Sequence, residues 1–110
     1  MLNESLALDL AFQALADPTR RGMVARLSRG PASVSELARP LTISLPAVLQ
    51  HLQALEASGL IASTKAGRVR TCRIGPRRLE PEVTWILEYQ RLMDDRFNRL
   101  EALLEHTKDN

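Results

Sequence analysis

The stretch over residues 33–60 constrains the fold of this chain most, because it holds the start signals of two short, closely spaced helices. Ser33, with Glu36 three residues later, has the pattern of a capping box at the start of the first helix. Ser44 is a second N-cap candidate, and Pro46 suits a first helical turn, where a missing N–H costs little. Two helices joined by a tight turn predict a helix-turn-helix, a layout that reads DNA.

The second of these helices, expected over 45–58, has an apolar face and a polar face. The apolar positions recur at intervals of three and four residues and are Leu45, Val48, Leu52 and Leu55. Gln50 and Gln53 lie opposite that face, and a glutamine amide is suited to pairing with an adenine edge. A surface for docking a protein would carry large aromatic anchors, which are missing here; Leu49 alone favours that alternative.

A basic β-hairpin is expected directly after these helices, over residues 60–74. Two runs with β-branched residues, 61–64 and 69–74, flank a loop that contains Gly67. Residues 65–78 contain six Lys or Arg and no acidic residue. A basic hairpin alone could be an exposed edge strand whose Lys and Arg side chains prevent pairing with another chain. Beside a helix-turn-helix it predicts a winged helix, whose wing follows the phosphate backbone or enters the minor groove.

Two further helices are expected at the ends, over 4–16 and 81–106, with a shorter one from about 17 to 28. Both end helices are apolar over more of their surface than a chain of 110 residues can easily cover. We therefore expect them to pair with a second copy. The residues expected at this interface are Leu6, Leu10, Ile86, Tyr89, Met93, Phe97, Leu100 and Leu104. The whole chain, 1–110, is then one mainly α winged helix-turn-helix domain with about five helices and a two-stranded wing.

The distribution of charge, the apolar runs and the single cysteine narrow the class of protein to which this chain can belong. Residues 1–78 hold 11 Lys/Arg against 5 Asp/Glu, whereas residues 79–110 hold 4 against 8, so a basic body precedes an acidic segment. This asymmetry is either a scatter of surface charge or the mark of a polyanionic partner. The first residues lack a basic leader, no apolar run approaches the ~20 residues needed to span a bilayer, and the single cysteine suits a reducing compartment. We expect a cytoplasmic protein that is not an enzyme, because no catalytic constellation is visible.

In this arrangement the chain resembles the ArsR/SmtB-type bacterial transcriptional regulators. The segments that carry the resemblance are ALADPTRR (14–21), SELA (35–38), SLPAV (44–48), HL with the leucine three residues on (51–55), ASGLI (57–61) and GRVR (67–70). The resemblance implies a homodimeric winged helix that represses transcription by binding a palindromic operator, and that an effector, unknown here, usually releases. It places the recognition helix on 45–58 and the wing tip on 65–70.

The expected DNA contacts combine this resemblance with the chemistry of the side chains. Operator-facing positions fall on Ser44, Pro46, Ala47, Leu49 and Gln50, and phosphate donors are expected at Ser33, Ser35, Arg20, Lys65, Arg68 and Arg70, with Gln53 reading bases. The chain departs from its relatives at Leu49, often a small polar residue, and at Thr42, often glycine. Arg20 lies in a first helical turn, where a cation needs a neighbouring phosphate or a salt bridge.

Neither a metal nor another cofactor is expected. The family's metal ligands would fall within SELAR (35–39), which has no cysteine, or on the last helix, whose only histidine is His106. His51 is expected at the edge of its helix's apolar face, making a hydrogen bond or a phosphate contact. Cys72 is either a packing residue or a redox-active thiol, with its pKa lowered by neighbouring arginines.

Overall fold

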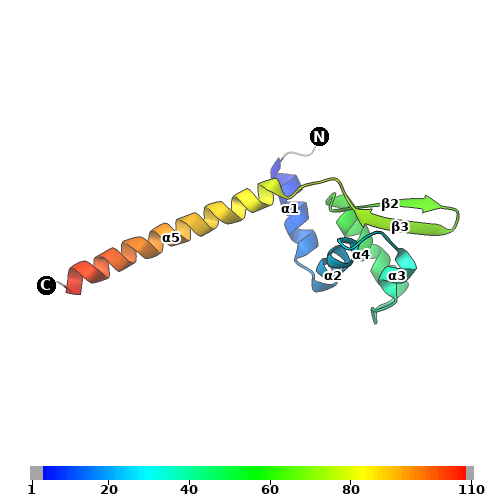
Figure 1. Ribbon diagram of the computed structural model, residues 1–110, viewed down its shortest axis with the longest axis horizontal. Helices are drawn as coiled ribbons and strands as arrows, with labels where there is room; N and C mark the ends of the chain where they lie inside the picture. The colour runs from blue at the N-terminus through cyan, green and yellow to red at the C-terminus, as the bar shows by residue number, and fades with distance from the viewer. Residues whose placement is uncertain (1–3, 109–110) are drawn as a thin grey trace. The chain divides into compact units, whose positions relative to one another are not determined.

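The computed structural model describes residues 4–108, which form five α-helices and one three-stranded antiparallel sheet (Figure 1). This confirms the mainly α fold with a winged helix-turn-helix. The chain divides into two compact units, the first ending at Arg78 and the second beginning at Leu79. The first unit contains the helix-turn-helix and the sheet, and the second contains one long helix.

The first unit begins with helices α1 (Glu4–Leu15) and α2 (Pro18–Leu27), close to the expected 4–16 and 17–28. Asp17 caps α2, because its carboxylate accepts the backbone N–H of Arg20 at 3.0 Å. The proline that follows occupies the first helical position, where no N–H is required. The break between α1 and α2 therefore has the physical basis that the sequence indicated, an N-cap followed by a proline.

Helices α3 (Val34–Ala38) and α4 (Leu45–Ala57) form the helix-turn-helix. The capping box at the start of α3 is complete, since Ser33 Oγ accepts the Glu36 N–H at 3.1 Å and the Ser33 N–H donates to Glu36 Oε1 at 3.4 Å. Ser44 caps α4 through the Ala47 N–H at 3.3 Å. In residues 4–108 a positive φ occurs only at glycines, so Thr42 fills its turn position without left-handed backbone.

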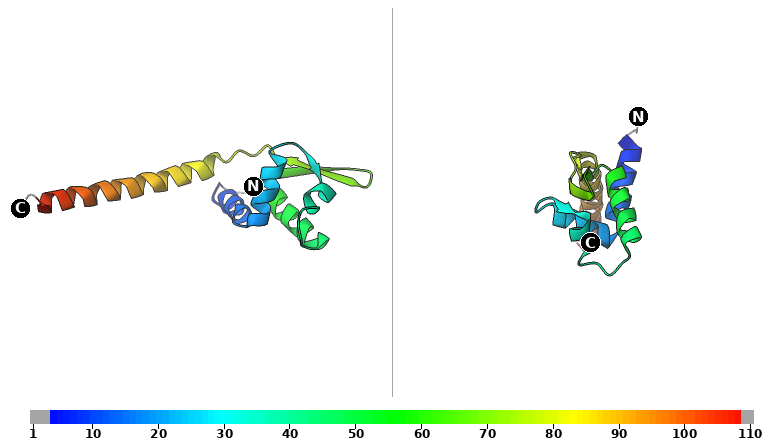
Figure 2. Two further views of the ribbon diagram at one scale, coloured as in Figure 1. Left: turned by 60° about the horizontal axis from the view of Figure 1, so that its bottom comes forward. Right: turned by 90° about the vertical axis from the view of Figure 1, so that its right-hand side faces the viewer.

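The sheet contains one strand more than expected. Strands β2 (Ile61–Ala66) and β3 (Val69–Ile74) form the hairpin, and β1 (Ala32–Ser33) pairs with the other edge of β3 in the order β1-β3-β2. The hairpin closes through Gly67, whose φ of +62° followed by a negative φ is the pattern of a type II′ turn. The hairpin extends beyond the helices of its unit (Figures 1 and 2).

The core of the first unit is built from aliphatic side chains, as the scarcity of aromatic residues required. Its buried members are Ala11, Ala14, Met23, Leu27, Ala32, Leu37, Val48, Leu52, Leu55, Leu60, Ile61 and Cys72. Leu45 was expected in this core, but it is 55% exposed. Leu45 is the first residue of α4, one turn before the buried Val48.

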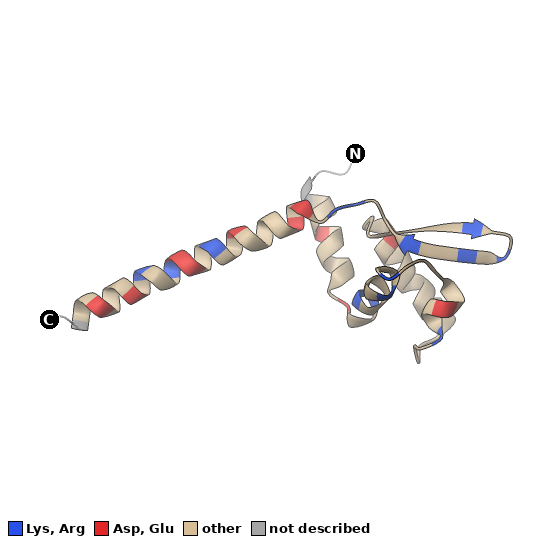
Figure 3. Cartoon of the chain, in the orientation of Figure 1, with Lys and Arg blue, Asp and Glu red and all other residues tan. Residues whose placement is uncertain are grey.

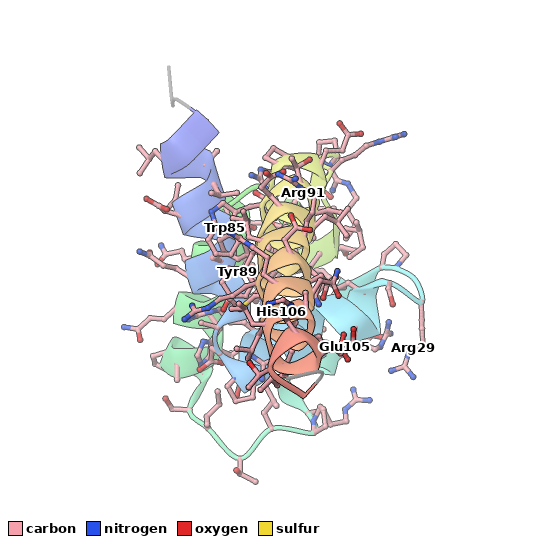
Figure 4. The ribbon with its side chains drawn as sticks, turned by 90° about the vertical axis from the view of Figure 1, so that its left-hand side faces the viewer. Arg29, Trp85, Tyr89, Arg91, Glu105 and His106 are labelled. Atoms are coloured by element: carbon pink, nitrogen blue, oxygen red, sulfur yellow. The ribbon has the colours of Figure 1, made fainter. Side chains whose placement is uncertain are left out.

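The second unit is helix α5 (Glu80–Lys108), slightly longer than the expected 81–106. Its apolar side chains are largely open to solvent, and Phe97 is 70% exposed. Trp85 and Tyr89, one turn apart, stack with ring centroids 5.8 Å apart and planes at 7° (Figure 4). No helix within residues 4–108 is long and apolar enough to cross a membrane.

Candidate nucleic-acid interface

Two adjoining grooves lie where helix α4 and the β2–β3 hairpin face each other. The first, here the α4 groove, has a volume of about 450 Å³ and is lined by Pro46, Leu49, Gln50, Leu52, Gln53, Glu56 and Arg70. The second, here the wing groove, has a volume of about 370 Å³ and is lined by Ser33, Val34, Ser35, Leu45, Leu49, Lys65, Arg68, Val69 and Arg70. Leu49 and Arg70 line both grooves, so the two form one continuous surface.

Most of the residues expected to contact DNA meet on this surface. Ser33, Ser35, Pro46, Leu49, Gln50, Gln53, Lys65, Arg68 and Arg70 line one groove or both. Ser44, the N-cap of α4, and Ala47, in its first turn, line neither groove. The surface also contains two apolar residues that were not expected there, Leu45 and Val69, which are 55% and 54% exposed.

Of the two capping serines, Ser33 is less available as a phosphate donor than the sequence suggested, whereas Ser44 is not. Ser33 Oγ already donates to Glu36 Oε1 at 3.1 Å, in addition to accepting a backbone N–H. Ser44 Oγ accepts a backbone N–H of α4 and keeps its own proton for another partner. Ser35 is exposed in the first turn of α3, where backbone N–H groups also favour anions.

The β2–β3 hairpin carries several Lys and Arg residues, some of them on directly paired positions (Figure 3). Lys65 on β2 is the direct pairing partner of Arg70 on β3, and both side chains are exposed. Like charges directly opposite each other destabilise an antiparallel pair. Arg68 lies in the two-residue turn and adds a third cation. A phosphate backbone beside the hairpin would offset this repulsion.

One acidic residue within the α4 groove was missed from the sequence. Arg70 Nη1 donates to Ser63 Oγ at 2.9 Å, and Ser63 Oγ donates in turn to the Glu56 carboxylate. Glu56 thereby holds an arginine of the wing against the end of α4. Its spacing of three residues from Gln53 was the available signal, because positions three apart share a helix face.

Arg20 has a structural role that its sequence context did not indicate. Its Nε donates to the Ala14 carbonyl at 2.8 Å and its Nη2 donates to the Gln13 carbonyl at 2.9 Å, so the guanidinium caps the end of α1. Carbonyls at a helix C-terminus favour a cation, which explains this arginine without a phosphate. We therefore leave Arg20 out of the DNA contacts proposed below.

His51 on α4 lies close to both Arg20 and Asp17. Its Nδ1 lies 3.3 Å from Arg20 Nη1 and 3.9 Å from Asp17 Oδ2, and the ring is half-buried. The backbone hydrogen bond from Arg20 lowers the pKa of Asp17, and the nearby His51 and Arg20 charges act in the same direction. His51 thus joins α4 to the start of α2.

Of the two interpretations of Cys72, the structure favours a packing residue over a thiol with a lowered pKa. Cys72 on β3 is fully buried, and this desolvation raises the pKa of its thiol. The carboxylate of Glu56 raises it further, and Arg70 only partly opposes these effects. The described part of the chain contains no group of three or more His, Cys, Asp or Glu side chains placed to hold a metal ion.

Comparisons with known proteins agree with this architecture. A family model described as a helix-turn-helix domain matches residues 15–64. The HTH-type transcriptional regulator Rv2034 of Mycobacterium tuberculosis is 49% identical over 71 residues, which are 64% of this chain and 66% of that protein. The transcriptional repressor SdpR of Bacillus subtilis is 27% identical over 78 residues, 71% of this chain and 87% of that protein. The chain is thus similar in sequence to helix-turn-helix regulators of transcription.

A solved structure defines the family more closely. The crystal structure of the ArsR family transcriptional regulator RHA00566 shares 48% sequence identity with this chain, with a TM-score of 0.72 over 86% of this chain and 97% of that one. The chain belongs to the ArsR/SmtB family of transcriptional regulators. This family consists of DNA-binding transcriptional regulators, which are not enzymes.

Proposed function

We propose that this protein is a homodimeric repressor that binds a palindromic operator through helix α4 and the basic wing. One observation carries the proposal: α4 and the β2–β3 hairpin border one continuous surface that gathers polar, apolar and basic side chains. Ser33 and Ser35 join this surface from an earlier part of the chain than α4 and the hairpin, so the fold itself creates this combination. We propose a cytoplasmic location, because that is where a bacterial operator would be bound.

The two parts of the surface suit different parts of a duplex. Gln50 and Gln53 are exposed on α4 and can pair with base edges in the major groove. Leu49, 43% exposed, is suited to contact a thymine methyl group. Lys65, Arg68 and Arg70 provide phosphate contacts from the wing, which position the protein without reading sequence.

Dimerisation is proposed from the exposed apolar stripe on α5. Ile86, Tyr89, Phe97, Leu100 and Leu104 are each more than half exposed, and Met93 is half-buried between them. Met93, Phe97 and Leu100, with Arg96, also line a shallow groove of about 290 Å³. On α1, Leu6, which is 44% exposed, and the half-buried Leu10 are also proposed as dimer contacts. A second copy would cover these side chains and would place two recognition helices on two half-sites.

An acidic protein partner is the second candidate, favoured by the exposed Leu45, Leu49 and Val69 beside the basic wing. The two candidates differ in how binding depends on salt, because each phosphate contact releases counterions from DNA. A protein partner would leave duplex DNA unbound at all salt concentrations.

The test is the affinity for a duplex containing the DNA upstream of the protein's own gene, measured by fluorescence anisotropy over a series of salt concentrations. We expect Arg68→Ala to weaken binding to all duplexes and to reduce the slope of log K against log [salt] by about one. Arg91→Ala is the matched control, because it removes an exposed arginine that pairs with Glu88 within α5. Salt-independent binding, or no binding to any duplex, would overturn the proposal.

A further inference from the structure

A third pocket lies between α2 and α3, and it shares no lining residue with the α4 groove or the wing groove. This α2–α3 pocket has a volume of about 340 Å³. That size falls within the range of small-molecule sites, about 300–1,000 Å³. Its walls come from α2, from the first helix of the helix-turn-helix, and from the turn that follows it.

The lining of the pocket joins an apolar wall to an excess of positive charge. Met23 and Leu37 are buried and Leu41 is half-buried, so these three side chains form the apolar wall. Arg26, Arg29 and Glu36 also line the pocket, giving two guanidinium groups and one carboxylate. A molecule that fits both features has a hydrocarbon body and one negative charge.

The two arginines are held differently. Arg26 Nη1 donates to the Gly30 carbonyl at 3.0 Å, and its Nη2 lies 3.6 Å from Glu36 Oε2. No hydrogen bond or ion pair ties the exposed Arg29 side chain to the rest of residues 4–108, and it extends outward from the first unit (Figure 4). Arg29 is therefore the cation that is available to an incoming carboxylate.

We propose that the α2–α3 pocket binds a small amphiphilic carboxylate, and that this ligand lowers the affinity of the protein for DNA. Met23, Leu37 and Leu41 hold its hydrocarbon body, and Arg29, with Arg26, pairs with its carboxylate. The second half of this statement rests on the DNA-binding function proposed above. The first half concerns the pocket alone.

Glu36 is the physical link between the pocket and the DNA surface. Its Oε2 faces Arg26 in the pocket at 3.6 Å, while its Oε1 accepts from Ser33 Oγ at 3.1 Å. Ser33 lines the wing groove. A carboxylate that pairs with Arg26 competes with Glu36 and adds a negative charge close to the proposed phosphate contacts. Since DNA is a polyanion, the ligand and DNA then weaken each other's binding reciprocally.

The pocket is tested by titrating the full ¹⁵N-labelled chain with octanoate, and separately with the neutral 1-octanol, without DNA. We expect octanoate to shift the amide resonances of Gly22 and Leu37, and to bind at least about tenfold more tightly than octanol because of the arginines. Arg29→Gln should weaken octanoate at least about fivefold. Arg39 is exposed at the end of α3 and does not line the pocket, so Arg39→Gln should leave the affinity for octanoate unchanged.

Three results would overturn the site: equal affinities for octanoate and octanol, equal affinities for the wild type and the Arg29 variant, or octanoate shifts confined to α5. The regulatory half is tested by repeating the DNA titration with saturating octanoate. We expect DNA affinity to fall at least about fivefold for the wild type and Arg39→Gln, and to stay unchanged for Arg29→Gln.

The outcomes separate the two proposals. Octanoate binding without any change in DNA affinity keeps the site and overturns its regulatory role. If the protein binds no duplex even without octanoate, the proposed function and the regulation that depends on it both fail. The amide shifts still decide whether the α2–α3 pocket takes a carboxylate.

Discussion

At the scale of single residues, Gly75 shows how closely the backbone packs where the sheet ends. A Cβ added at Gly75 would lie 2.4 Å from the carbonyl oxygen of Gly59, so the backbone would have to shift. We expect Gly75→Ala to lower the free energy of unfolding by about 1–3 kcal/mol, the usual cost of overpacking.

Gly22 provides the matched control for Gly75. It lies inside α2, and a Cβ there would meet nothing within 4 Å. Gly22→Ala should raise the free energy of unfolding by about 0.5–1 kcal/mol, because alanine loses less conformational freedom in a helix. Both variants are measured by urea denaturation at one protein concentration. Equal effects of the two substitutions would contradict the close contact at Gly75.

Asp17 makes the stability of the fold depend on pH in one direction. Because its pKa is lowered in the folded chain, the charged carboxylate contributes stability above its unfolded pKa of about 3.9. That contribution disappears as the pH falls through the lower folded pKa. Asp17→Asn keeps a capping oxygen without the charge. The wild type should therefore melt at a higher temperature near neutral pH, and the difference should close below about pH 4. A difference that persists at pH 2 would rule out this origin.

At the scale of elements, the hairpin is coupled to α4 through the Glu56, Ser63 and Arg70 chain. Glu56 is a carboxylate on a surface proposed to meet DNA, so its charge opposes every phosphate that approaches. We expect Glu56→Gln to strengthen binding to unrelated duplexes roughly threefold or more, and to strengthen operator binding less. Glu101→Gln on α5 is the control with the same charge change. Equal gains for operator and unrelated DNA would show that Glu56 does not affect specificity.

The sequence predicted the elements whose signals are local. The helices began where Asp17, Ser33 and Ser44 could cap them, and the hairpin turned at Gly67. Strand β1 was missed because it has two residues and pairs with β3, about 40 positions further along the chain. A two-residue strand has no periodicity of its own.

The site was predicted less completely than the elements, because backbone atoms and burial decide parts of it. Arg20 binds carbonyl oxygens at the end of α1, and no side-chain pattern reveals such acceptors. Cys72 lies next to an arginine in the sequence, but its burial decides the direction of its pKa shift. Ser35 and Arg70 line the same groove because β1 pairs with β3, and the sequence did not predict this pairing.

At the scale of the whole molecule, charge and apolar surface are divided between the two units. Residues 1–78 carry a net charge of +6 and residues 79–110 a net charge of −4. The basic unit contains the surface proposed for DNA, whereas the acidic unit exposes most of the large apolar side chains. An acidic helix is a poor partner for DNA and a suitable one for a second copy, since its apolar stripe is self-complementary in a two-fold dimer.

The dimer is tested by placing one charge on either side of α5. Phe97→Glu puts a carboxylate in the apolar stripe, and we expect a monomer in sedimentation at micromolar concentration, because a buried unpaired charge is costly. Ala102→Glu adds the same charge about 140° around the helix from Phe97, and should leave the dimer intact. The monomeric variant should also lose operator affinity, because two half-sites then bind separately. A wild-type chain that sediments as a 12.3 kDa monomer would overturn the dimer and leave the exposed stripe for another partner.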